Sequence, residues 1–318
     1  MWVRTRAVVA GGVVLVLVAV VGIVLGLRQV GDRLRLPLTG RACTVQTDDG
    51  QVSLNAEQMA HAATIAAIGS RRGMPERAVV VALATAYQES GLRNLAGGDR
   101  DSIGLFQQRP SQGWGTPEQI RDTRYATRKF YAALKKVRGW EEMRVTDAAQ
   151  KVQRSAFPEA YEKWADESQV LTQALLGHAT TAVTCTLGGD PAMRGAAALD
   201  ALGRGLTLDW GVAAFASGDD QPAGRGYFST DVDGDPTLLK VGVNDFERSP
   251  EGSLMTSAEG VRAGWRYAHW LVSHAKPHGV KRVVYDGREW TAKRGDWKRL
   301  PDSDRGDTQV LAEVHADV

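Results

Sequence analysis

Residues 76–91 read ERAVVVALATAYQESG, a segment with helical spacing that is apolar on nearly every side. A helix that is apolar all round is buried, so we expect this segment to be the central helix of a domain. Gly91 favours the end of the helix because glycine adopts the left-handed conformation without strain. Glu89 is therefore expected at the end of a buried helix, where the chain enters a glycine-rich loop.

Further helical segments surround this one. Asn55 is expected to cap the helix before it, and Pro75 suits the first turn of the buried helix. The other segments with helical spacing cover residues 54–71, 122–137, 146–155 and 168–182. Strand signals are almost absent in this part of the chain. Residues 46–187 are therefore predicted to form a mainly α domain.

The composition and the hydrophobic pattern of the sequence change near residue 190. Glycine becomes frequent and short β-type runs appear, with one clear helix at 257–276. Residues 195–318 are therefore predicted to form a smaller α+β domain. Three histidines lie close together in sequence here, but Pro277 interrupts the helix that would align the last two, His274 and His278. We expect no metal site and no other cofactor.

Residues 7–27 form an apolar run of 21 residues without a charged or strongly polar side chain. At about 1.5 Å per residue a helix of this length matches a bilayer core of roughly 30 Å. We expect an uncleaved transmembrane helix. A cleavable signal peptide is the alternative, although its apolar stretch is usually about 7–15 residues and ends in a small-residue cleavage site.

The chain contains two cysteines, Cys43 and Cys185, at the two edges of the predicted α domain. They are expected to form a disulfide that closes the domain, with two unrelated buried thiols as the alternative. A disulfide indicates an oxidising compartment. Residues 1–45 are accordingly predicted to hold a cytoplasmic stub, a single membrane span and a juxtamembrane stretch. The bulk of the chain would then lie outside the cell membrane.

The charge distribution argues against one class of function. The chain has 39 basic and 37 acidic residues, a net charge of +2. Residues 1–40 contain five arginines and one aspartate, so the remainder has a net charge of −2. A nucleic-acid-binding protein is expected to carry a basic domain or stripe. None is visible, and nucleic acid is excluded as a partner.

The loop after Glu89 contains residue types that suit a sugar-binding site. Residues 101–115 read DSIGLFQQRPSQGWG, with amide and small polar side chains that bind hydroxyl groups. Trp114 lies between two glycines and is free to present its ring. Partial burial favours the protonated form of a carboxyl group, which suits a general acid. The alternative for Glu89 is a surface residue, or one paired with Arg93 or Arg100.

These residues together carry a resemblance to a known family. QESG at 88–91 and SIGLFQQ at 102–108 resemble the Glu-Ser and Gly-Leu-Met-Gln motifs of lysozyme-like lytic transglycosylases, with Phe106 in the place of methionine. Residues 50–165 look like a secreted or membrane-anchored subgroup from high-GC Gram-positive bacteria. The resemblance implies that peptidoglycan glycan strands are the partner. It also implies that Glu89 is both general acid and general base at the β-1,4 bond between N-acetylmuramic acid and N-acetylglucosamine.

The resemblance also implies binding residues around Glu89. The candidate substrate-binding residues are Ser90, Ser102, Gln107, Trp114 and Tyr161. The family's later Ala-Tyr-Asn-Ala-Gly motif is replaced here by residues 154–158. A hydrolytic mechanism would need a second carboxylate, for which Asp99 and Asp101 are candidates, although both also suit loop capping. A non-catalytic protein that binds or scaffolds peptidoglycan remains the alternative function.

The C-terminal part resembles a different group of proteins. Residues 269–297 and the terminal VHADV look like a domain distantly similar to the zinc D-alanyl-D-alanine carboxypeptidases. Those enzymes hold zinc with a His…Asp pair and a terminal His-x-His. Residues 221–227 contain no histidine, and His315 alone remains of the terminal pair. Residues 195–318 are therefore predicted to be non-catalytic and to bind wall peptide or another protein.

Overall fold

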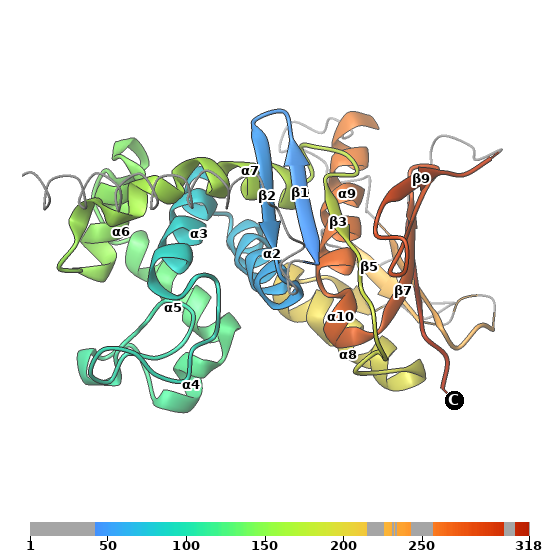
Figure 1. Ribbon diagram of the computed structural model, residues 1–318, viewed down its shortest axis with the longest axis horizontal. Coiled ribbons are helices and arrows are strands. Elements are labelled where there is room, and N and C mark those ends of the chain that lie inside the picture. The colour runs from blue at the N-terminus through green and yellow to red at the C-terminus, as the bar shows by residue number, and fades with distance from the viewer. Residues whose placement is uncertain are drawn as a thin grey trace, which may run out of the picture. The chain divides into compact units, whose positions relative to one another are not determined.

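The computed structural model describes residues 42–214, 226–230, 232, 234–242, 257–301 and 309–317 (Figure 1). The predicted membrane span at 7–27 lies outside these residues. Within the described ranges, no helix combines the length and the apolar character needed to cross a bilayer.

The fold is not mainly α, so the fold class predicted from helical spacing is wrong. The described residues form one sheet of seven strands, in the order β4-β5-β6-β10-β7-β8-β9, and one of three strands, β2-β1-β3. The strands of the smaller sheet are β1 (Cys43–Thr47), β2 (Gly50–Leu54) and β3 (Val183–Cys185). The strands of the larger sheet are β4 (Ala213–Ala214), β5 (Tyr227–Ser229), β6 (Leu238–Gly242), β7 (Val280–Tyr285), β8 (Arg288–Thr291), β9 (Trp297–Arg299) and β10 (Gln309–Val314).

The smaller sheet was missed because its strands are short and one partner is distant in sequence. β1 and β2 form an antiparallel hairpin, and β3 pairs with β1 from about 140 residues further along the chain. A strand of three to five residues shows too little alternation to be distinguished from a helix by period alone. The N-terminal part therefore combines helices with a sheet.

Most helices of this part lie where the spacing predicts them, but the helix predicted at 168–182 covers Ala165–Leu175, and the short helix Pro117–Arg121 was not predicted. The helices of the described residues are α2 (Ala56–Arg71), α3 (Glu76–Ser90), α4 (Pro117–Arg121), α5 (Thr123–Leu134), α6 (Val145–Gln153), α7 (Ala165–Leu175), α8 (Gly195–Trp210), α9 (Ser257–Ser273) and α10 (Ala275–His278). Short 3-10 helices occur at η1 (Pro110–Gln112), η2 (Trp140–Glu142) and η3 (Pro158–Trp164). Asn55 caps α2 as predicted, accepting a 2.8 Å hydrogen bond from the backbone of Gln58.

Helix α3 is the centre of the N-terminal part. Every residue from Ala78 to Tyr87 is buried, and α2, α5, α6, α7 and η3 all contact the helix. Gly91 ends it in the left-handed conformation, with φ of 62°. The prediction of a buried central helix that stops at Gly91 is confirmed.

The predicted disulfide between Cys43 and Cys185 is present. The two residues are direct partners in the β1–β3 ladder, and 142 positions separate them in sequence. In the loop-entropy account a bridge that closes so long a loop stabilises the fold by up to ~5 kcal/mol. The disulfide thus fastens the two ends of the N-terminal part to each other.

The C-terminal part packs directly on the N-terminal part. Helix α9 contacts β7 and β10 of the larger sheet on one side and α2, α7 and β3 on the other (Figure 1). Three tryptophans are fully buried here, Trp265, Trp270 and Trp290. These indoles form core rather than an exposed sugar-binding surface.

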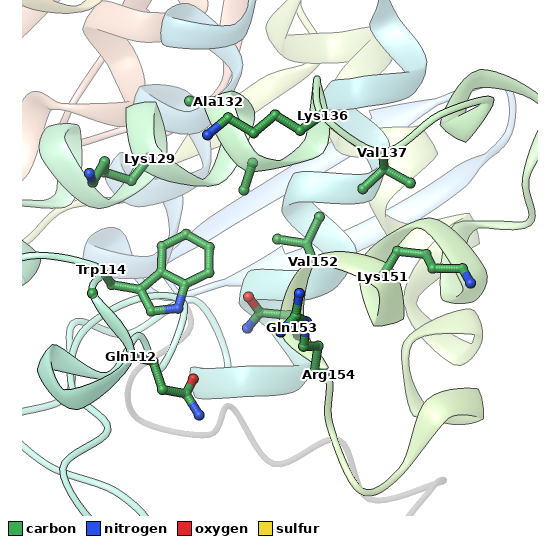
Figure 2. A pocket seen from close by; sticks show the side chains of 12 residues that line it. Gln112, Trp114, Lys129, Ala132, Lys136, Val137, Lys151, Val152, Gln153 and Arg154 are labelled. Carbon is green, nitrogen blue, oxygen red and sulfur yellow. The ribbon is translucent and has the colours of Figure 1, made fainter.

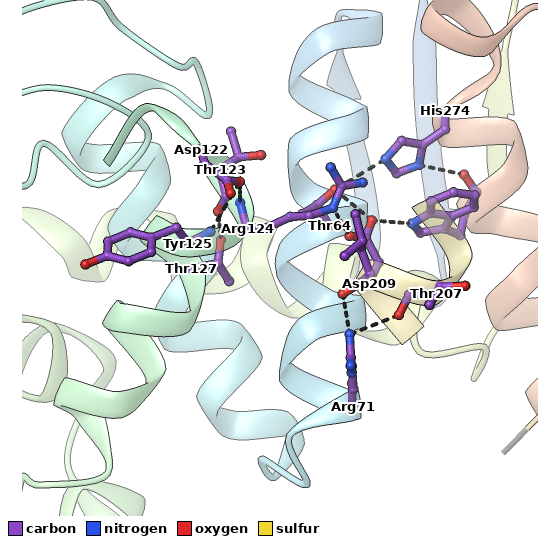
Figure 3. A network of polar contacts seen from close by, with 12 residues as sticks. Thr64, Arg71, Asp122, Thr123, Arg124, Tyr125, Thr127, Thr207, Asp209 and His274 are labelled. Atoms are coloured by element: carbon purple, nitrogen blue, oxygen red, sulfur yellow. Dashed lines mark hydrogen bonds and ion pairs between the residues drawn. The ribbon is translucent and has the colours of Figure 1, made fainter. Parts of the chain in front are cut away.

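A buried carboxylate joins four helices across this contact. Asp209 on α8 is completely buried and accepts hydrogen bonds from Arg124 on α5, Trp270 on α9 and Thr64 on α2 (Figure 3). Burial raises the pKa of Asp209, while the ion pair with Arg124 acts in the opposite direction. His274 accompanies the network, 3.3 Å from the hydroxyl of Thr64. The network therefore fixes the second part against α2 and α5.

His269 makes a second connection between the two parts. Its Nδ1 lies 2.7 Å from the carbonyl of Ala174, and its Nε2 accepts a 3.1 Å hydrogen bond from the amide of Ala182. This arrangement requires a neutral imidazole with its proton on Nδ1. Burial lowers the pKa of His269 from 6.5 to about 4.

Replacing Asp209 by alanine is expected to lower the free energy of unfolding by about 3–5 kcal/mol, because it leaves the Arg124 guanidinium without its buried partner. Urea denaturation measures the change. Asp200→Ala on the same helix is the control, since Asp200 pairs with Arg204 at the exposed surface; its cost should stay below about 1 kcal/mol. Equal effects of the two variants would contradict the role given to the network.

Stability is expected to fall as the pH drops from about 6.5 to about 4. In this pH window the imidazole of His269 is protonated in the unfolded chain and neutral in the folded protein. Each pH unit of acidification therefore lowers the free energy of unfolding by about 1.4 kcal/mol through this imidazole. Urea denaturation across the window should show a shallower pH dependence in His269→Gln. An unchanged pH dependence in that variant would refute the assignment.

Candidate functional site

Glu89 lies in the last turn of α3, half-buried where three elements meet. Its Oε1 accepts a 2.7 Å hydrogen bond from the hydroxyl of Tyr161 in η3 and a 3.0 Å bond from Nε2 of Gln153 at the end of α6. No ion pair joins Glu89 to another described residue, and Arg100 lies beside Asp99 instead. Among the described residues, Glu89 is therefore not paired with Arg93 or Arg100, which was one of the alternatives.

Tyr161 is suited to donate to this carboxylate. The side chain is completely buried, and burial followed by the charge of Glu89 raises the pKa of Tyr161 well above its ordinary value. The phenol therefore keeps its proton at neutral pH. Tyr161 is the predicted substrate-binding residue that the structure brings into direct contact with Glu89.

Aromatic contacts hold η3 on the end of α3. The ring of Trp164 stacks on Tyr87 with a centroid distance of 4.8 Å, and its Nε1 donates a 3.1 Å hydrogen bond to Oε1 of Gln88. Tyr161 precedes Trp164 by one turn. The stack therefore places the phenol of Tyr161 over Glu89.

Gln153 was not among the predicted site residues. Its Nε2 also lies 2.8 Å from the carbonyl of Phe106, so the amide bridges Glu89 and the loop that follows α3. The sequence places Gln153 near the end of a predicted helix. That position carries no chemical signal by itself, because its neighbour Glu89 is 64 residues earlier.

The two predicted serines serve the loop structure. The hydroxyl of Ser90 lies 2.7 Å from the carbonyl of Leu105 and accepts from the amide of Arg93. Ser102 is buried, and its amide donates to the carbonyl of Asp99. Both side chains lie within the protein rather than on an open wall. Their part in substrate binding stays a prediction.

Gln107 lies in a tight hairpin that Ile103 and Gln108 close by mutual backbone hydrogen bonds. Its φ of 47° is unusual for a residue with a side chain and costs roughly 1–2 kcal/mol. Its side-chain Nε2 donates a 3.1 Å hydrogen bond to the carbonyl of Gly104. A Cβ on Gly104 would lie 2.9 Å from the carbonyl of Ile120, so the hairpin requires glycine there.

A cleft of about 730 Å³ is lined by Gln153, the side chain that donates to Glu89 (Figure 2). The residues that line it come from α5, α6 and the loop around Trp114, and they include Gln153 but not Glu89. Gln153 is thus the side chain that links the cleft to the carboxylate. Trp114 is half-buried, and its carbonyl accepts a hydrogen bond from the hydroxyl of Tyr125, which positions the loop.

Basic side chains surround the cleft and acidic ones do not. The cations among the lining residues are Lys129, Lys136, Lys151 and Arg154, and no carboxylate is among them. Arg154 ends α6 in the left-handed conformation, with φ of 54°. The charged side chains that line the cleft are therefore all positive.

The two aspartates considered as a second catalytic carboxylate lie in the loop. Asp101 accepts hydrogen bonds of 2.8 Å from Nε of Arg109 and from the amide of Ser111, and these bonds hold its pKa well below the ordinary value. Asp99 is exposed. The geometry supports loop capping for Asp101.

The imidazoles of His269 and His274 in the C-terminal part are engaged in packing and in hydrogen bonds to the backbone. His274 stacks on the ring of Trp270 at a centroid distance of 4.1 Å, and the amide of His315 donates to Gly279. Within the described ranges, no three His, Cys, Asp or Glu residues are grouped as metal ligands.

No protein-family model matches the chain, and no curated protein matches it in sequence. The assignment of function accordingly depends on the residues of the site.

Replacing Arg154 by glycine is expected to raise the free energy of unfolding by about 1 kcal/mol, because glycine relieves the left-handed backbone at this helix end. Lys151→Gly is the matched control. It also removes a cation from the cleft, but at a right-handed position in the last turn of α6, and should cost up to about 1 kcal/mol. Urea denaturation of both variants measures the contrast, and destabilisation by both would contradict the strain assigned to Arg154.

Proposed function

We propose that the chain cleaves peptidoglycan glycan strands at the β-1,4 bond between N-acetylmuramic acid and N-acetylglucosamine, with Glu89 as general acid and general base. The observation that carries the proposal is one half-buried carboxylate with two hydrogen-bond donors, one of which, Gln153, also lines a cleft of about 730 Å³. The motif resemblance at residues 88–91 and 102–108 supplies the substrate class.

The hydrogen bonds of Glu89 indicate different roles for its two carboxylate oxygens. Tyr161 and Gln153 both donate to Oε1, and no described residue donates to Oε2. In the proposed reaction Oε2 carries the proton and gives it to the glycosidic oxygen as the bond breaks. The two donors on Oε1 then stabilise the carboxylate that remains.

The same carboxylate completes the reaction. It takes the proton of the muramyl 6-hydroxyl while that oxygen attacks the anomeric carbon, which gives a 1,6-anhydro product. A hydrolytic reaction would instead need a second carboxylate to activate water or to act as nucleophile. The engagement of Asp101 with Arg109 and Ser111 supports the intramolecular route.

The proposed binding residues differ in how they meet the cleft. Trp114 lines it and offers a ring to a sugar face, as aromatic residues in such sites do. Ser90, Ser102 and Gln107 are proposed to act through the shape of the loop that they stabilise. The Cys43–Cys185 disulfide supports a location outside the cytoplasm, in the compartment that holds the cell wall.

A non-catalytic protein that binds or scaffolds peptidoglycan is the second candidate. It is favoured by the engagement of the Ser90 and Gln107 side chains with the loop's own backbone. Such a protein would sediment with purified peptidoglycan without releasing fragments from it.

Glu89→Gln is expected to abolish the clearing of a suspension of purified peptidoglycan, with a loss of about 10²–10⁴-fold, because the amide cannot supply the proton. The thermal midpoint should stay close to that of the unchanged protein, since glutamine still accepts from Tyr161. Glu141→Gln, an exposed glutamate in η2, is the control and should clear at the normal rate.

Mass spectrometry of the released fragments distinguishes the routes. Anhydro-muramyl ends support the reaction proposed here, and reducing ends would replace it by hydrolysis. If the unchanged protein sediments with peptidoglycan and releases nothing, the scaffolding function is correct instead.

A further inference from the structure

The charge of the cleft exceeds what a neutral sugar requires. Four of its lining residues are cations, contributed by α5, by the turn after α5 and by the end of α6, and none is acidic. Hydroxyl and acetamido groups are bound by amides, hydroxyls and aromatic rings. A site that binds only hydroxyl and acetamido groups would not be stabilised by four neighbouring cations, because like charges repel.

Three of the four cations form no ion pair with another described residue, and the fourth, Lys151, has a carboxylate, that of Asp147, in electrostatic range. No ion pair joins Lys129, Lys136 or Arg154 to a carboxylate of the described residues, and the ammonium of Lys129 lies 5.6 Å above the ring of Tyr125. Asp147 lies one helical turn before Lys151, but its carboxylate accepts from Arg144. The positive charge is therefore available to a ligand.

The position of these cations relates them to the proposed reaction site. Figure 2 shows Lys129 and Lys136 along one wall with the Trp114 ring facing them, and Gln153 with Arg154 on the other side. Gln153 donates to Glu89. A strand with one sugar at Glu89 and its neighbour at Trp114 would thus carry its substituents past the lysines.

We propose that this cleft binds the free carboxylates of the stem peptides on the glycan strand. The inference rests on the proposed function, because it takes the strand as the ligand. Muramyl residues differ from their neighbours in bearing a lactyl-linked peptide, whose unamidated carboxyl groups are ionised at neutral pH. A cleft lined by one sign of charge focuses its field and concentrates ligands of the opposite sign.

The strand is favoured over a separate polyanion because the cations and Glu89 are joined through a single side chain, Gln153. The consequence is selectivity. The protein binds strands with free stem-peptide carboxylates in preference to strands whose carboxylates are amidated and to peptide-free chito-oligosaccharides.

Binding to the full chain with Glu89→Gln tests this without turnover. The probes are a purified muropeptide tetrasaccharide with free carboxylates and the same compound with those carboxylates amidated, measured by calorimetry. The free form should bind about tenfold more tightly, as expected for loss of charge-assisted contacts. Added salt should reduce its affinity and leave that of the amidated form nearly unchanged.

Charge reversal locates the effect. Lys136→Glu should lower the affinity for the carboxylated probe about tenfold. Lys135 is exposed and adjacent but does not line the cleft, so Lys135→Glu should change this affinity less than about twofold. Lys129→Gln provides a milder second variant. Thermal midpoints establish that each protein is folded.

The outcomes separate this inference from the proposed function. Equal affinity for the two probes, or equal losses in Lys136→Glu and Lys135→Glu, would overturn the inference even if the unchanged protein cleaves peptidoglycan. Preferential, salt-sensitive binding without any cleavage would support the cleft assignment and remove the catalytic function. A glycerol phosphate polymer that displaces the carboxylated probe at lower charge concentration would also overturn it.

Discussion

The burial of α3 on every side is the constraint on which the proposed site depends. Five other elements contact this helix, so its position and rotation are fixed by core packing rather than by the loop that follows. Glu89 is placed at the point where the apolar surroundings end, and Tyr161 and Gln153 reach it from elements packed on the same helix. A carboxylate held in this way keeps its direction without a charged partner.

The second part of the chain bears on the site through α5. This helix supplies Lys129 to one wall of the cleft and Arg124 to the buried carboxylate of Asp209. The ion pair fixes α5 against α8 and α9, and so fixes the wall. The C-terminal part therefore helps to hold the helix that carries this wall of the cleft.

The sequence determined the local features and missed those that arise from tertiary contact. The bounds of α3, the Asn55 cap and the disulfide follow from spacing, capping chemistry and the position of two cysteines. Strand β3 could not be read, because its three residues acquire their order from β1 far earlier in the chain. Gln153 and the lysines of the cleft could not be predicted either, because they come together only in the folded protein. In the sequence, lysines on a helix are indistinguishable from ordinary solvated surface residues.

The placement of the disulfide has a mechanical consequence. Cys43 begins the first described strand, and Cys185 ends the last strand before the C-terminal part. Tension applied between the chain ahead of Cys43 and the chain beyond Cys185 passes through the sulfur–sulfur bond. The residues between them, α3 and Glu89 included, form a closed loop outside that line of force. Pulling on the ends would thus load a covalent bond and leave the geometry around Glu89 unstretched.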